Sequence, residues 1–181
     1  MVNKFESFTP LMHSYEYEFI AKYLTPEDTL LEWGSGNSTI YFSGLVKKII
    51  SVEHDDRWYN KIKKVVEQLG IDNVEQYNIH AHTPDPIPCR YEQFKDYIEF
   101  PKKEQLQFTK VLIDGRARKY CAKSIADYIN EDCVIFIHDF NREDYQKVLK
   151  YYDVIEVITD GQGIAALKKK DAIILPTNNE Y

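Results

Sequence analysis

Four acidic residues stand at the ends of short apolar runs, where a parallel sheet would place the residues of a binding site. They are Glu32, Glu53, Asp114 and Asp139. The carboxyl ends of parallel strands meet at one edge of a sheet, and ligands bind in the crevice outside that edge. Carboxylates there can bind an ammonium, ribose hydroxyls or a divalent cation, or can remove a proton. The alternative is that Asp114 and Asp139 only cap the helices that follow them.

The first acid, Glu32, precedes a turn and a helix start that can hold a ligand through the main chain: Gly34, Ser35, Gly36, Ser38 and Thr39. Glycines allow a ligand to approach the backbone, and the N–H groups of a helix start point toward it. The dinucleotide fingerprint requires a third glycine where this chain has Thr39, and Glu32 would repel a pyrophosphate. We therefore expect a cofactor that carries an amine and a ribose, not a nicotinamide dinucleotide.

A second acid, Glu53, ends the apolar run 49–53 and is followed by His54. It lies about 20 residues after Glu32, the spacing at which an acid can bind ribose hydroxyls. Glu32-Trp33-Gly34-Ser35-Gly36 and Ile49-Ile50-Ser51-Val52-Glu53-His54 together resemble motifs I and II of the class I S-adenosylmethionine-dependent methyltransferases. The resemblance implies that the glycine loop binds the methionine end of S-adenosylmethionine. It implies that Glu53 binds both ribose hydroxyls.

Two later segments, Ile113-Asp114-Gly115-Arg116 and Ile137-His138-Asp139-Phe140-Asn141-Arg142, resemble strand ends of small sugar O-methyltransferases such as the glucuronoxylan 4-O-methyltransferases. The resemblance implies that Asp114 lies beside the transferred methyl group. It also implies that Asp114 and Asp139 bind a divalent cation, Mg²⁺ or Mn²⁺, in some of these enzymes. Phe140 departs from this pattern, because catechol-type enzymes have asparagine there.

A sugar hydroxyl is a weak nucleophile, so its methylation requires a general base or a metal ion. The candidates are Asp114, Asp139 and His138. We favour Asp139 over His138, because neighbours on a strand point to opposite faces and only one can face the crevice. Arg116 can bind an acidic acceptor such as a uronate or a sugar phosphate, or it can form a salt bridge with a neighbouring acid.

The elements that must position these residues alternate along the chain. Hydrophobic periodicity predicts strands at 29–33, 49–53, 74–81, 110–114 and 133–139, and helices at 14–24, 39–45, 58–69, 119–129 and 143–151. Alternation of this kind favours a Rossmann-like, doubly wound α/β fold with a mostly parallel sheet. Residues 154–158 and 164–167, joined by a glycine-containing turn, predict a C-terminal antiparallel hairpin.

The chain of 181 residues predicts a single domain, 1–181. Residues 83–105 interrupt the alternation with a proline-rich run and four aromatic residues: Tyr91, Phe94, Tyr97 and Phe100. Aromatic rings stack well on sugars, so we expect this insertion to bind the acceptor; the alternative is packing over the sheet edge.

Composition limits the partners. The net charge of −6 argues against a nucleic-acid-binding protein, and no apolar run is long enough for a membrane span. Three cysteines without metal-site spacing indicate a reducing compartment, so we expect a cytoplasmic protein. The acceptor is expected to be a small molecule or glycan, and the sequence does not indicate the oligomeric state.

The favoured function is transfer of a methyl group from S-adenosylmethionine to a hydroxyl of a sugar, a glycan or another small polar acceptor. Two alternatives stay open. One is a nicotinamide-dependent oxidoreductase or epimerase, and the other is a module that binds the cofactor without catalysis.

Overall fold

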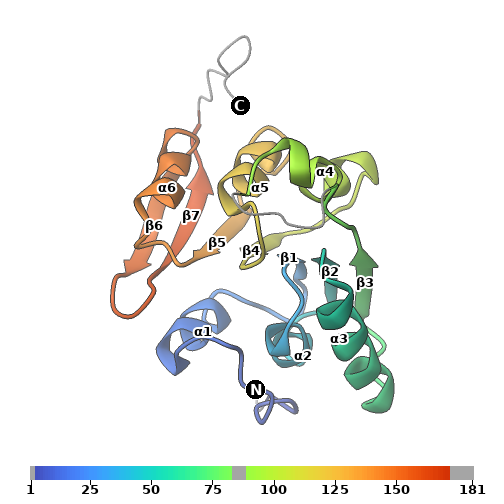
Figure 1. The fold of residues 1–181 in the computed structure, drawn as a ribbon. Helices are drawn as coiled ribbons and strands as arrows, with labels where there is room; N and C mark the ends of the chain where they lie inside the picture. The colour runs from blue at the N-terminus through green and yellow to red at the C-terminus, as the bar shows by residue number, and fades with distance from the viewer. Residues whose placement is uncertain (1–2, 83–88, 172–181) are drawn as a thin grey trace.

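The computed structural model describes residues 3–82 and 89–171. In this part of the chain the central feature is a seven-stranded sheet of order β3-β2-β1-β4-β5-β7-β6 (Figure 1). The strands are β1 (Thr29–Trp33), β2 (Lys48–Glu53), β3 (Val74–Asn78), β4 (Lys110–Ile113), β5 (Val134–His138), β6 (Tyr152–Ile158) and β7 (Ile164–Lys169). Neighbouring strands among β1 to β5 are parallel, and β7 is antiparallel to both β5 and β6. The predicted Rossmann-like fold with a C-terminal hairpin is confirmed.

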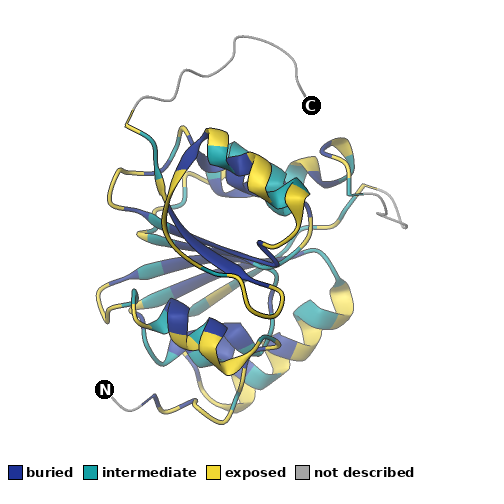
Figure 2. Cartoon of the chain, turned by 90° about the vertical axis from the view of Figure 1, so that its left-hand side faces the viewer, coloured by how far each residue is buried: buried dark blue, intermediate teal, exposed yellow. Residues whose placement is uncertain are grey.

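Helices cover both faces of the sheet, with their exposed sides outward (Figures 1 and 2). One face carries α1 (Ser14–Ala21), α2 (Asn37–Ser43) and α3 (Asp56–Gln68). The other carries α4 (Lys95–Lys103), α5 (Arg118–Ile125) and the short α6 (Glu143–Gln146), which continues as the 3-10 helix η2 (Lys147–Lys150). No helix in the described ranges is long and apolar enough to span a membrane.

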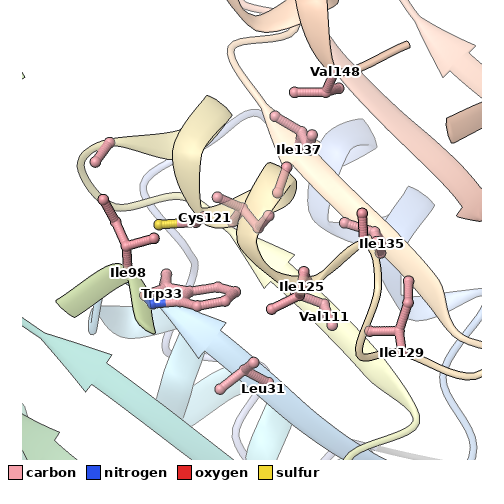
Figure 3. Close-up of a cluster of buried hydrophobic side chains, with 14 of the residues drawn as sticks. Leu31, Trp33, Ile98, Val111, Cys121, Ile125, Ile129, Ile135, Ile137 and Val148 are labelled. Atoms are coloured by element: carbon pink, nitrogen blue, oxygen red, sulfur yellow. The ribbon is translucent and has the colours of Figure 1, made fainter. Parts of the chain in front are cut away.

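The period-two geometry of the strands divides the core between the two faces. In β1, Leu31 and Trp33 pack toward α4 and α5, in the cluster shown in Figure 3, whereas Leu30 packs toward α1 and α2. Glu32 lies on the same side of the strand as Leu30. The alternation therefore directs this acid beneath α2 and away from the larger cluster.

Residues 89–105 differ from the sequence prediction, because they contain a helix. Pro101 lies inside α4, and the proline-rich residues 83–88 lie outside the described ranges. The four aromatic residues of this segment are buried in the larger core cluster: Tyr91, Phe94, Tyr97 and Phe100. The predicted acceptor-binding role of residues 83–105 therefore does not rest on these four rings.

Candidate functional site

A cavity of about 230 Å³ opens at the carboxyl ends of β1, β2 and β4. The loop after β1 forms one wall, the end of β2 the second, and the loop between β4 and α5 the third. The lining residues are Leu11, Gly34, Ser35, Gly36, Asn37, Ser38, Glu53, His54, Trp58, Asp114, Gly115, Arg116 and Arg118. This is the edge of the sheet at which the fold class places ligands.

Two glycines of the β1 loop serve different purposes. Gly34 has φ +99°, and a Cβ atom there would lie 2.6 Å from both the N and Cα atoms of Gly115. The loops after β1 and β4 are thus in direct backbone contact. Gly36 has extended backbone at φ −164°. A Cβ atom on Gly36 would meet only atoms of Ser38, Oγ at 3.5 Å and N at 3.9 Å, both ordinary van der Waals contacts. Gly36 therefore keeps open space at the cavity wall.

Glu32 braces this loop from inside the protein. Its side chain is fully buried and accepts hydrogen bonds from Ser38 Oγ at 2.5 Å, Thr39 Oγ1 at 2.5 Å and Ser51 Oγ at 2.7 Å. Thr39 Oγ1 also accepts a hydrogen bond from the N–H of Gly36 at 3.0 Å. Burial raises the pKa of Glu32 to about 7, although the three hydroxyl donors oppose this shift.

Glu53 holds the opposite wall together. Its Oε2 accepts the N–H of Ser35 at 2.8 Å, and its Oε1 accepts the N–H groups of His54 and Asp55 at 2.8 Å each. The Glu53 side chain is buried but lines the cavity. Oε2 has one described donor, so it has capacity to accept a further hydrogen bond from a ligand.

Asp114 is backed by a buried histidine. His138 Nδ1 lies 2.8 Å from Asp114 Oδ1, and His138 Nε2 lies 3.3 Å from Oε2 of the fully buried Glu16 on α1. Burial of the ring lowers the pKa of His138, but the hydrogen bond and charge of Asp114, with the charge of Glu16, outweigh this and raise it. His138 therefore lies between the two acids, with one ring nitrogen facing each of them.

An arginine lies between the two acids proposed as metal ligands. Arg118 NH2 is 3.1 Å from Asp114 Oδ1, and Arg118 NH1 is 3.1 Å from Asp139 Oδ2. The same guanidinium donates to the main-chain oxygens of Asp114, Gly115 and His138 at 2.9, 3.0 and 2.6 Å. Across residues 3–82 and 89–171 no group of three or more His, Cys, Asp or Glu side chains is arranged to hold a metal ion. The side chains around Asp114 and Asp139 fit a guanidinium, and they do not fit a divalent cation.

The backbone near these acids adopts a rare conformation. Asp139 has φ +60° and Ala117 has φ +54°, both in the left-handed region that non-glycine residues seldom occupy. Ala117 is the N-cap of α5, so its turn directs Arg118 back over the strand ends. Such strain, of order 1–3 kcal/mol per residue, persists where the surrounding structure enforces it, and it clusters at functional sites.

No protein-family model matches the sequence, and neither does any curated protein sequence. Solved structures match the fold. A methyltransferase-like protein from Silicibacter pomeroyi aligns over 93% of this chain and 91% of its own, with a TM-score of 0.71 and 22% identity. This is a methyltransferase fold. An rRNA methylase from Streptococcus thermophilus aligns over 89% of this chain and 99% of its own (TM-score 0.61, 14% identity). A candidate methyltransferase from Streptococcus mutans, in complex with SAH, aligns over 88% and 100% (TM-score 0.60, 12% identity).

Within this methyltransferase fold the predicted site residues divide into two groups. Those that line the cavity are Gly34, Ser35, Gly36, Ser38, Glu53, His54, Asp114 and Arg116. Those that are buried behind it are Glu32, Thr39, His138 and Asp139. Of the four acids expected to face one crevice, Glu53 and Asp114 therefore line the cavity. Glu32 and Asp139 support its walls from behind, Glu32 through hydroxyl groups and Asp139 through guanidinium groups.

Some lining residues carried no clear signal in the sequence. Leu11 precedes the first predicted helix, and Trp58 fits the apolar face of α3, so neither was assigned to the site. Arg118 lies two residues after Arg116, the cation expected to bind an acidic acceptor. The structure gives the two arginines different environments: Arg118 is bound by the two acids, whereas Arg116 is exposed at the cavity with no described ion pair.

Proposed function

We propose that this protein transfers a methyl group from S-adenosylmethionine to a hydroxyl of a sugar, a glycan or another small polar acceptor. The observation that carries the proposal is the cavity itself, where Gly36 leaves open space between two carboxylates, Glu53 and Asp114. S-adenosylmethionine has an amine and two ribose hydroxyls, which can donate hydrogen bonds to carboxylates such as these. The likeness to solved methyltransferases supplies the fold and supports the same conclusion.

The residues at the cavity fit the proposed cofactor. The remaining acceptor capacity of Glu53 Oε2 suits a ribose hydroxyl, and the wall at Gly36 permits close approach of the cofactor to the main chain. Glu32 takes a supporting role in this proposal, because its oxygens already accept three hydroxyl hydrogen bonds. Glu53 and Asp114 would repel a pyrophosphate, so the proposal does not extend to a nicotinamide cofactor.

The bound cofactor supplies a methyl group already activated by the sulfonium charge, so the protein mainly has to orient the acceptor and take up a proton. Asp114 is the group we assign to the acceptor hydroxyl. Its Oδ1 is held by His138 and Arg118, and its Oδ2 has no partner among the described residues. His138, 2% exposed and paired with two acids, is assigned to positioning Asp114 and not to accepting the proton.

Arg116 is the residue we assign to acceptor selection. Its exposed guanidinium would favour acceptors that carry a carboxylate or phosphate near the methylated hydroxyl. No step is assigned to a metal ion, since Arg118 lies between the two acids. The three cysteines are free thiols, which supports the proposed cytoplasmic setting, and the net charge of −6 supports an acceptor other than a nucleic acid.

The test of cofactor identity is titration calorimetry with S-adenosylhomocysteine and, separately, with NADH. We expect S-adenosylhomocysteine to bind and to stabilise the protein by about 2.7 kcal/mol at 100 times its Kd. Binding of NADH in place of S-adenosylhomocysteine would refute the proposal.

The acceptor class is tested by supplying labelled S-adenosylmethionine with uronic acids and matched neutral sugars. Methyl transfer should favour the uronic acids, and Arg116→Gln should remove this preference. A preference unchanged in Arg116→Gln would contradict the assigned role of Arg116.

A further inference from the structure

A second cavity, of about 190 Å³, lies between α5 and η2. It is lined by Lys119, Tyr120, Lys123, Lys147, Val148, Lys150 and Tyr151. The chain as a whole has a net charge of −6, yet no acid is among the described residues that line this cavity. Such a concentration of lysines in an acidic protein indicates a ligand with negative charge.

The lysines form two facing pairs. Lys119 and Lys123 stand four residues apart on α5, and Lys147 and Lys150 stand three residues apart on η2, spacings that place each pair on one face of its helix. Asp144 shows that an anion can span the pairs, because its Oδ2 lies 2.7 Å from Lys119 Nζ and its Oδ1 lies 2.8 Å from Lys147 Nζ. The Asp144 carboxylate thus already binds one lysine of each pair, at one end of the cavity.

One residue of the cavity wall, Tyr151, carries a buried polar atom without a described hydrogen-bond partner. Tyr151 is 3% exposed, and its hydroxyl makes no hydrogen bond to any described residue. An unsatisfied buried hydroxyl costs about 1–3 kcal/mol, so a ligand oxygen that paired with it would recover this energy. The ammonium of Lys150 lies 5.0 Å from the centre of the Tyr151 ring, and no described acid forms an ion pair with Lys150.

The remaining wall is apolar or aromatic. Val148 is buried at 2% exposure, and the ring of Tyr120 lies beneath the ammonium of Lys119 at 4.9 Å. An inorganic ion would satisfy the lysines and leave these surfaces uncovered. A phosphate group attached to a small organic body would use both.

We propose that the cavity between α5 and η2 binds a small organic phosphate, with its phosphate group on the lysine pairs and the Tyr151 hydroxyl, and its organic body against Tyr120 and Val148. Lys123 and Lys150 bind the phosphate at the end opposite Asp144. The site is separate from the methyltransferase cavity and does not depend on the proposed methyl transfer.

The test uses phenyl phosphate as the probe, titrated without cofactor into the isotope-labelled full chain and followed by NMR amide shifts. Inorganic phosphate and phenol are the comparison ligands, since the first carries only the phosphate group and the second only the organic body that the site is proposed to bind. We expect phenyl phosphate to bind more tightly than either, with shifts confined to residues 118–123 and 147–151. Shifts at residues 34–38 instead would assign the phosphate to the first cavity and overturn the proposal.

Variants separate the contributions. Lys123→Gln combined with Lys150→Gln should raise the Kd of phenyl phosphate at least tenfold, and Tyr151→Phe should raise it severalfold without lowering the stability of the free protein. The charge-matched control, Lys47→Gln with Lys64→Gln, changes two exposed lysines elsewhere and should leave Kd within twofold. An equal loss of affinity in this control would mean nonspecific charge attraction and would overturn the site.

A final arm distinguishes a small ligand from a nucleic-acid backbone. A single-stranded RNA oligonucleotide offers the same phosphate chemistry without a terminal monoester. The proposal expects RNA to bind more weakly than phenyl phosphate at equal phosphate concentration. Tighter binding of RNA at the same amides would replace the small-ligand proposal with a nucleic-acid contact.

Discussion

Substitution of the two cavity glycines by alanine should separate folding from ligand binding. In Gly34→Ala the new Cβ would lie 2.6 Å from backbone atoms of Gly115, and the residue would have to keep φ +99°. Overpacking costs about 1–3 kcal/mol and an unfavourable left-handed backbone about 1–2 kcal/mol, so we expect a loss of about 2–5 kcal/mol in the free energy of unfolding.

Gly36→Ala should behave in the opposite way. The extended backbone at Gly36 suits alanine, and its nearest non-neighbouring atom is Ser38 Oγ at 3.5 Å. The free energy of unfolding should stay equal or rise by about 0.4–1 kcal/mol, because alanine has less freedom in the unfolded chain. The methyl group would enter the space proposed for the cofactor. We expect the Kd of S-adenosylhomocysteine to rise at least tenfold, about 1.4 kcal/mol.

Gly70→Ala supplies the matched control. Gly70 also has a positive φ, +59°, but a Cβ atom there would meet nothing within 4 Å. Urea unfolding followed by tryptophan fluorescence gives the stability of all three variants, and calorimetry with S-adenosylhomocysteine gives Kd for those that fold. The difference between Gly34→Ala and Gly70→Ala measures the steric clash at Gly34 together with the added strain of its φ of +99°, which lies outside the left-handed well that Gly70 occupies. Equal losses in these two variants would refute the close contact with Gly115, and an unchanged Kd in Gly36→Ala would refute the placement of the cofactor.

Three further predictions concern charged residues. Arg118→Ala should destabilise the fold by about 3–5 kcal/mol in urea unfolding, because it removes both the cation that bridges two largely buried acids and the donor to three main-chain oxygens. Arg142→Ala, on a 60% exposed side chain bound to the same Asp139, should cost about 1 kcal/mol or less. Equal effects would contradict the role of Arg118 as the internal cation. The folded protein holds the Glu32 proton up to about pH 7, above its ordinary pKa of 4.5, so the free energy of unfolding should fall by about 3 kcal/mol as pH rises through this window. Glu32→Gln should flatten that slope, and a slope retained in this variant would show that another group is responsible. On an identified acceptor, Asp114→Asn should lower turnover about 100-fold or more while the Kd of S-adenosylhomocysteine changes little. Asp139→Asn should lower turnover less, because Asp139 reaches Asp114 through Arg118. Full activity in both variants would mean that the two acids only cap the following helices.

The sequence alone was enough to predict the order of the elements and the edge of the sheet where the cavity forms. Apolar runs of period two and helical runs of period 3.6 are local properties, and parallel strands that alternate with helices must present their carboxyl ends together. The helix predicted at 58–69 is confirmed for the same local reason, and α3 ends at Gln68, shortly before Gly70. Helix α4 was not predicted. Pro101 and the preceding prolines favour an extended segment when the sheet on which α4 packs is left out of consideration.

Which strand-end residue faces the cavity was decided only by the tertiary structure. Arg116 and Arg118 are two residues apart and chemically identical, yet the left-handed turn at Ala117 and the register of β5 direct one toward solvent and the other between two acids. His138 is held by Glu16, 122 residues earlier in the chain. Contacts of this kind arise from packing between distant elements, and no local periodicity encodes them. The sequence therefore determined which residues could do chemistry, and the packing determined which of them line the cavity and which support it.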